Sequence, residues 1–239
     1  MIYVTSDLHG YPVEKFKALL SKAGFSRDDF LFVLGDVIDR GPEGVQLLRW
    51  MMAQPNVELI LGNHEDMMLS CSFLFEEITD DSVRDLNMRK MSCLNVWQNN
   101  GATPTIDGLT KVNHGVREMI LEYVSEAPLY DSVSVGGRDY LLVHSGLGNY
   151  REGKKISEYT SDELLWCRPG TKTEFSHDFV TVFGHTPTFR YGAEYEGKAI
   201  IRDTWINVDT GAATGLAPML LRLDDLAEFY ADSDEEENL

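Results

Sequence analysis

Three short apolar runs, each followed at once by polar residues, constrain the fold of this chain more than any other feature. The runs span residues 2–5, 30–34 and 57–61, and each has the length and composition of a buried strand. Residues 14–23 and the segment that starts at Pro42 carry apolar side chains at helical spacing. This β-α-β-α-β order predicts parallel strands joined by crossover helices.

The rest of the chain divides into a segment with helical periodicity and a segment rich in predicted strands. Residues 66–127 are rich in Met, Asn, Ser and charge with helical periodicity, which predicts a helical cap inserted beside the sheet. Strands are predicted again at 129–135, 139–143, 179–183, 205–208 and 219–223, with a hairpin at Gly136-Gly137. We therefore predict one α/β domain over residues 1–230 and a disordered acidic tail over 231–239.

Charge and cysteine usage exclude several classes of function. The formal net charge of −18 argues against general binding of nucleic acid backbones or anionic membranes, which need clustered Lys and Arg. The three cysteines form no CxxC pair, so neither a disulfide framework nor a zinc ribbon is predicted. The sequence shows no signal peptide and no run long enough to span a bilayer. We expect a cytoplasmic protein without a membrane partner.

Polar clusters stand at the ends of five predicted strands. They read SDLHG, GDVIDRG and GNHE after the first three strands, then LLVHSG and VFGHT after two later ones. In open parallel sheets, ligands bind in the crevice outside the carboxyl ends of the strands. The clusters therefore predict one site that gathers the following residues: Asp7, His9, Asp36, Asp39, Arg40, Asn63, His64, His144 and His185.

The donor atoms in these clusters are carboxylate and amide oxygens and imidazole nitrogens. Such a set suits Mn, Fe or Zn rather than a structural zinc site built from cysteine. Two aspartates, one asparagine and three histidines of these clusters make six candidate ligands. Six ligands are too many for one ion with open positions, so they favour two ions that share a bridging carboxylate. Paired divalent ions are a standard device for in-line displacement at phosphorus. We predict two divalent metal ions, with Mn as the first choice.

The series D-x-H, GD-x-x-DRG and GNHE, followed by two strand-end histidines, resembles the metal-dependent phosphoprotein phosphatases within the calcineurin-like metallophosphoesterases. The short bacterial and phage serine/threonine phosphatases are the most similar members, and the resemblance runs from Asp7 to the VDTG stretch at 208–211. It implies two facing mixed β-sheets flanked by helices, with a helical cap insertion. It also assigns metal ligation to Asp7, His9, Asp36, Asn63, His144 and His185, with Asp36 bridging the two ions.

The same resemblance implies roles for the charged residues that bind no metal. Arg40 would bind the substrate phosphate, and Arg168 in ELLWCRPG would be a second arginine on the phosphoryl oxygens. His64 would donate a proton to the leaving alkoxide, and Asp39 would orient it. A hydroxide that bridges the two metals would attack phosphorus in a single step.

Two enzyme functions remain open at this point. The first is a serine/threonine protein phosphatase acting on a phosphorylated protein or a small phosphoester. The alternative is a symmetrical dinucleoside tetraphosphatase or another nucleotide phosphohydrolase. That group typically lacks the second aspartate and carries GNHD, whereas this chain has Asp39 and GNHE, which favours the phosphatase. A phosphopeptide-binding scaffold without turnover and a nucleic-acid phosphodiesterase are disfavoured, and the sequence leaves the oligomeric state open.

Each cluster also has an ordinary structural explanation. Asp and Gly dominate turns, and an isolated buried histidine is more often structural than a ligand. The conjunction of five clusters at strand ends is what favours a site. Outside them, His114 is interpreted as a helix-start residue and His177 as a loop residue, and Glu65 is considered only for local pairing with an arginine.

Overall fold

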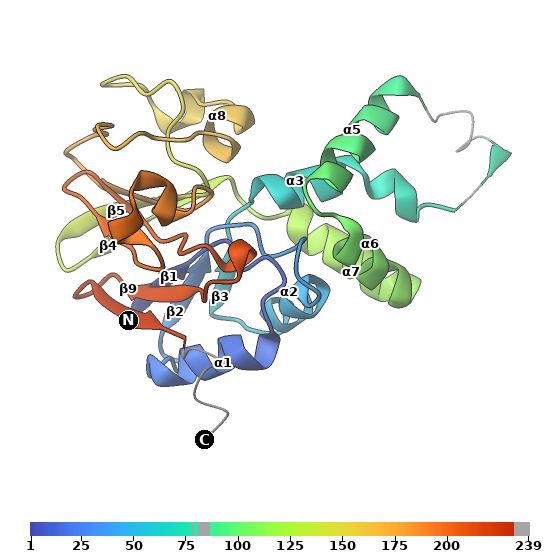
Figure 1. The fold of residues 1–239 in the computed structure, drawn as a ribbon, viewed down its shortest axis with the longest axis horizontal. Helices are drawn as coiled ribbons and strands as arrows, with labels where there is room; N and C mark the ends of the chain where they lie inside the picture. The colour runs from blue at the N-terminus through green and yellow to red at the C-terminus, as the bar shows by residue number, and fades with distance from the viewer. Residues whose placement is uncertain (78, 81–86, 232–239) are drawn as a thin grey trace.

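The structure is a computed structural model that describes residues 1–77, 79–80 and 87–231. Its body consists of two five-stranded β-sheets with helices on the outside (Figure 1). The α/β architecture of two mixed sheets flanked by helices, expected from the sequence, is confirmed. The predicted acidic tail, apart from residue 231, lies outside the described residues.

The first sheet has the strand order β10-β9-β1-β2-β3. β1, β2 and β3 are parallel, as the β-α-β-α-β pattern predicts, and β9 pairs antiparallel with both β1 and β10. The strands span Ile2–Thr5 (β1), Phe30–Val33 (β2), Val57–Leu59 (β3), Met219–Arg222 (β9) and Ala227–Tyr230 (β10).

The second sheet has the strand order β4-β5-β6-β8-β7. β5, β6 and β8 are parallel, so this sheet also has a block of parallel strands whose carboxyl ends lie at one edge. β4 and β5 form the predicted hairpin through Gly136 and Gly137, which both have positive φ. The strands span Tyr130–Val135 (β4), Arg138–Val143 (β5), Val180–Phe183 (β6), Ile200–Ile201 (β7) and Trp205–Asn207 (β8).

The two sheets pack face to face over a shared apolar core. Val4, Phe32 and Leu34 of the first sheet belong to the same buried cluster as Leu142 and Val182 of the second. The other face of the first sheet packs on the helices, so its central strands are buried on both sides. This explains why residues 30–34 form a continuous apolar run rather than an alternating one.

The helices form two groups. α1 (Val13–Lys22) and α2 (Gly44–Met52) cross over between the parallel strands of the first sheet. The segment between β3 and β4 contains α3 (Asn63–Ser70), η1 (Ser72–Phe75), α5 (Met88–Asn99), α6 (Thr103–Lys111) and α7 (His114–Ser125). These helices gather on one side of the sheets, and their buried side chains join the core of α1 and α2 (Figure 1).

Short elements complete the fold and mark where sequence reasoning fell short. They are α8 (Ser161–Leu165) and the 3₁₀ turns Ile156–Glu158, Thr188–Tyr191, Ala193–Tyr195 and Ala212–Thr214. Strands β7 and β10 and helix α8 were not predicted, because two to five residues carry too little periodicity. Among the described residues, no helix is both long and apolar enough to cross a membrane.

Candidate metal centre

The carboxyl ends of the parallel strands of both sheets meet at one place. Each strand end contributes a buried polar residue: Asp7 after β1, Asp36 after β2, Asn63 after β3, His144 after β5, His185 after β6 and Asp209 after β8. All but His144 line one small pocket of about 40 Å³, and His144 lies against Asn63 and His185. The structure thus brings the predicted strand-end residues together.

The backbone bends sharply where these residues stand. Six of the predicted site residues have positive φ, a region that residues other than glycine rarely adopt: Asp7, His9, Asp36, Asp39, Arg40 and His185. Such conformations cost of the order of 1–3 kcal/mol each and persist where the surrounding structure enforces them, typically at functional sites. The bends turn neighbouring side chains, such as those of Asp7 and His9, into the same pocket.

In one half of the site, an acceptor nitrogen of His144 faces the side-chain oxygens of Asn63 and Asp36. The Nδ1–H of His144 donates to the carbonyl of Leu34 at 2.7 Å, which leaves its Nε2 as an acceptor. This Nε2 faces Asn63 Oδ1 at 2.9 Å, His185 Nδ1 at 3.2 Å and Asp36 Oδ1 at 3.4 Å. The buried Nε2 of His185 has no hydrogen-bond partner. A divalent cation is the kind of group that satisfies His144 Nε2 together with the facing oxygens of Asn63 and Asp36.

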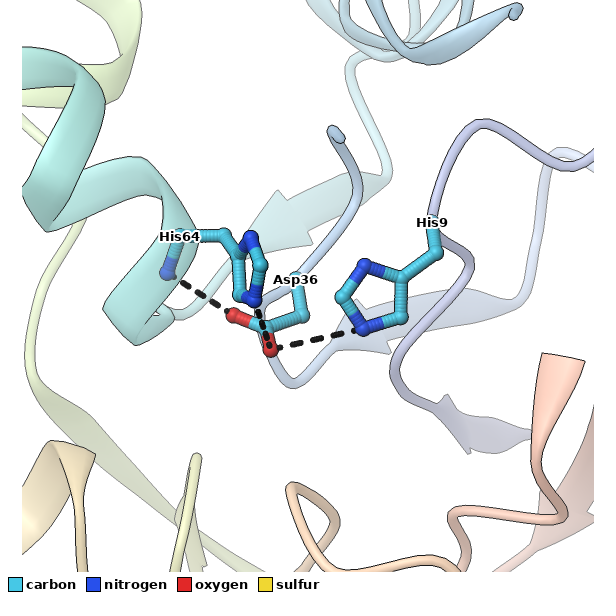
Figure 2. Close-up of side chains that lie close together, drawn as sticks. All are labelled: His9, Asp36 and His64. Atoms are coloured by element: carbon cyan, nitrogen blue, oxygen red, sulfur yellow. Dashed lines mark hydrogen bonds and ion pairs between the residues drawn. The ribbon is translucent and has the colours of Figure 1, made fainter. Parts of the chain in front are cut away.

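The other half is built around the second oxygen of Asp36, which lies between two imidazoles (Figure 2). The Nδ1–H of His9 donates to the carbonyl of Ile38 at 3.0 Å, which leaves its Nε2 as the acceptor nitrogen. This Nε2 lies 3.6 Å from Asp36 Oδ2 and 3.8 Å from Asp7 Oδ1. His64 Nε2 lies 3.8 Å from the same Asp36 oxygen, so distance alone groups His64 with these residues.

The pKa values of these groups are shifted in the directions expected of buried metal ligands. Burial raises the pKa of Asp36 well above its usual value, and the nearby carboxylates of Asp7 and Glu65 raise it further. Burial also raises the pKa of Asp7, and lowers the pKa values of His9 and His144. Neutral imidazoles and crowded carboxylates are the forms that ligate divalent cations, and a bound cation compensates the crowding.

Asp39 and His64 form a buried pair next to this cluster. His64 Nδ1–H donates to Asp39 Oδ2 at 2.6 Å. Burial raises the pKa of Asp39 to about 6 and lowers that of His64 to about 2. At neutral pH Asp39 is therefore ionised and His64 neutral, with its Nε2 accepting from Arg40 Nη2 at 3.1 Å.

Two exposed arginines line the same pocket. Arg40 also donates from Nη1 to His9 Nε2 at 3.0 Å, so its guanidinium covers both imidazoles. Arg168 donates from Nη1 to the carbonyl of His185 at 3.2 Å and to Thr186 Oγ1 at 3.1 Å. The remaining donors of both side chains are available to a bound anion. The arrangement is chemically suited to a phosphoryl group held above the strand-end cluster.

Sequence reasoning missed two acidic residues of this site. Glu65 bonds the backbone rather than an arginine: its carboxylate accepts from the N–H groups of Asp36 at 2.7 Å, Val37 at 2.9 Å and Ile38 at 3.3 Å. Asp209 is buried beside Asp7, and burial raises its pKa well above the usual value. Its place at the end of a predicted strand was the signal that could have revealed it.

Replacing Glu65 with glutamine is expected to destabilise the fold and weaken metal binding. A glutamine amide turns at least one N–H toward the backbone N–H groups of Asp36–Ile38, which leaves buried donors unpaired and costs about 2–3 kcal/mol of the free energy of unfolding. Urea unfolding and a manganese titration measure both effects. Glu163→Gln is the control, because Glu163 accepts from the backbone N–H of Thr160 away from the site. Equal effects of the two substitutions contradict this role.

The remaining histidines lie elsewhere. His114 begins α7, as predicted, and its Nδ1 lies 3.0 Å from a Glu118 oxygen on the surface. His177 is exposed and lines a surface cavity with residues of the β7–β8 region.

A larger cavity of about 610 Å³ lies between the β4–β5 hairpin and the segment around Tyr150 and Tyr159, and no strand-end residue lines it. Converging ligand chemistry, rather than size, identifies the site.

Comparison with known proteins gives a consistent family signal. A family model described as calcineurin-like phosphoesterase matches residues 1–212. A protein of Acidovorax sp. (strain JS42), named symmetrical bis(5'-nucleosyl)-tetraphosphatase, is 28% identical over 208 residues, which cover 84% of this chain and 62% of the relative. A protein of the same name from Chromobacterium violaceum is 38% identical over 196 residues, covering 78% and 57%. This chain therefore spans less than two thirds of the length of either relative.

Among solved structures, a crystal structure described as that of a candidate diadenosine tetraphosphatase superposes with a TM-score of 0.64. The superposition covers 96% of this chain and 91% of the other, at 16% sequence identity. At that identity the likeness concerns the fold alone.

Proposed function

Because the chain belongs to the calcineurin-like phosphoesterase family, we propose that it is a metal-dependent hydrolase of dinucleoside polyphosphates, cleaving them symmetrically. The observation that carries the hydrolase proposal is the pocket in which two arginines face a cluster of buried carboxylates and imidazoles. The choice of substrate is supported by the names of the two bacterial relatives.

The comparisons support this function better than the protein phosphatase that the sequence favoured. One argument for the phosphatase was glutamate rather than aspartate after His64. Glu65 binds the backbone of Asp36–Ile38 and does not line the pocket. In this chain Glu65 therefore holds the loop rather than facing a substrate, so GNHE does not argue for a particular leaving group.

We assign the ligands by the two halves of the site. Asp7 and His9 would hold one ion, and Asn63, His144 and His185 the other, with Asp36 between them. When bound, two divalent ions, in our proposal manganese, supply an activated water and neutralise charge on the phosphoryl oxygens. Arg40 and Arg168 bind the non-bridging oxygens and orient the scissile bond.

A second candidate function is serine/threonine phosphate ester hydrolysis, which the Asp39–His64 pair favours. An alkoxide leaving group needs a proton, and a histidine whose Nδ1–H is held by a carboxylate can pass one on from Nε2 after taking it up from solvent water. A nucleoside phosphate leaving group is stable without one. The pair is present in full, so phosphoester turnover by the same site deserves a direct comparison.

A paired initial-rate assay with manganese at neutral pH tests the proposal. One substrate is diadenosine tetraphosphate and the other is a phosphoserine peptide. We expect preference for the dinucleotide, with ADP as the nucleotide product because cleavage is symmetrical. Preference for the peptide, or AMP and ATP as products, overturns the proposed function.

A further inference from the structure

We infer that Trp97 and Thr105, two residues of the helical segment between β3 and β4, are positioning residues that hold Asp39 so that His64 presents its Nε2 to the leaving group. The inference rests on the second candidate function, phosphate ester hydrolysis, to the extent that His64 is the proton donor of that reaction. The helical segment would then orient a proton donor, in addition to any role in substrate choice.

Every hydrogen-bonding group of Asp39 beyond its carbonyl is engaged by these partners or by His64. Oδ2 accepts from His64 Nδ1 at 2.6 Å and from the indole Nε1–H of Trp97 at 2.8 Å. Oδ1 accepts from Thr105 Oγ1–H at 2.6 Å, and the Asp39 N–H donates back to the same hydroxyl at 2.9 Å. Two side chains therefore fix both carboxylate oxygens, and the carboxylate fixes the imidazole.

The partners are fully enclosed, so water cannot take over their hydrogen bonds without a rearrangement. Asp39 and Trp97 are 0% exposed and Thr105 is 2% exposed. Hydrogen bonds to a buried charge are stronger than exposed ones, and a buried acceptor left unpaired is costly. The bonds from Trp97 and Thr105 thus determine the carboxylate's orientation.

The helical segment also holds the backbone of the loop after β2, residues 35–41. The carbonyl of Gly101, between α5 and α6, accepts from the Arg40 N–H at 2.9 Å. A Cβ at Gly101 would lie 2.8 Å from Arg40 Cγ, so only glycine permits this approach. Asp39 and Arg40 both have positive φ, at 70° and 65°. These contacts from one segment hold the loop in that unfavourable conformation.

The orientation of the Asp39 carboxylate matters because the two ring nitrogens of His64 have different roles. While Nδ1–H is committed to Asp39, Nε2 is the atom that faces the pocket, next to Asp36 and Arg40. If the carboxylate rotates, the ring loses both its tautomer and its direction. Transfer of a proton from solvent through Nε2 to a poor leaving group then slows, whereas a leaving group that departs without a proton is unaffected.

The test compares leaving groups in Trp97→Phe and Thr105→Val. For both variants, we expect hydrolysis of phenyl phosphate to fall roughly 10- to 100-fold more than hydrolysis of 4-nitrophenyl phosphate, which corresponds to losing one hydrogen bond to a charged group. Thr105→Ser keeps the hydroxyl and should restore most of the difference. Trp205→Phe is the matched control, because it removes another buried indole N–H, which donates to the carbonyl of Thr173 away from the site.

A second measurement needs no metal and no turnover. In the metal-free protein, the Nδ1 proton of His64 should give a downfield, slowly exchanging NMR signal, which shifts and exchanges faster in Trp97→Phe and Thr105→Val but not in Trp205→Phe. Equal losses on both esters, or an unchanged His64 signal, overturn the inference. A wild-type enzyme that hydrolyses neither ester contradicts the second candidate function, phosphate ester hydrolysis, instead, and the NMR comparison still decides the positioning role.

Discussion

Asp36→Asn is expected to abolish metal-dependent phosphohydrolase activity, with a loss of at least about 10³-fold, while the fold stays intact. Asp36 reaches both halves of the site, through Oδ1 toward His144 and through Oδ2 toward His9. Divalent ions contribute several kcal/mol to charge stabilisation in such reactions, and each 1.36 kcal/mol is a factor of ten in rate. An asparagine carbonyl still accepts the His64 N–H, so the local structure is retained.

The same substitution should stabilise the metal-free protein. Burial and the neighbouring carboxylates of Asp7 and Glu65 raise the folded-state pKa of Asp36 above its unfolded value. A group with a raised folded-state pKa contributes stability at low pH that is lost as the pH rises through that pKa. Asparagine does not titrate. The melting temperature of Asp36→Asn should therefore exceed that of the wild type increasingly as the pH is raised from about 4, the unfolded pKa of aspartate.

Thermal melts with and without manganese, together with initial rates, check both effects. Manganese should raise the melting temperature of the wild type but not of Asp36→Asn. Asp29→Asn is the control, because Asp29 is a buried carboxylate that pairs with the N-terminal amine away from the site. An Asp36→Asn enzyme that keeps manganese-dependent activity refutes the ligand role.

His64→Asn should slow hydrolysis of a phosphoserine peptide by roughly 10²- to 10⁴-fold, as for loss of a general acid. The loss should be much smaller for diadenosine tetraphosphate and for a nitrophenyl ester, because their leaving groups need little protonation. Manganese binding should be retained, because our assignment gives the metal ions to Asp7, His9, Asp36, Asn63, His144 and His185, and gives His64 to Asp39.

Initial rates on the three substrates and a manganese titration separate the two possible roles of His64. His177→Asn, at an exposed histidine outside the site, serves as the control. Equal losses on all three substrates together with weaker manganese binding would show that His64 is a metal ligand, as its distance to Asp36 alone permits.

Much of the fold and the site followed from local sequence patterns. Apolar runs of strand length alternate with helical periodicity at residues 2–61, and this pattern predicts the parallel strands that the structure contains. Because polar residues follow each parallel strand, their meeting at one edge also followed from the strand assignment. The short elements β7, β10 and α8 were not predicted, because so few residues do not establish a hydrophobic periodicity.

The sequence by itself determined which chemical groups gather at the strand ends, since strand order and turn residues place Asp7, Asp36, Asn63, His144 and His185 there. Only the tertiary structure decided what holds them. The backbone N–H groups of Asp36–Ile38 meet Glu65, and Asp39 meets Trp97 and Thr105, across 27 to 66 residues of chain. Such contacts depend on how separate helices pack against the loop at residues 35–41, and hydrophobic periodicity carries no information about which polar groups that packing brings together.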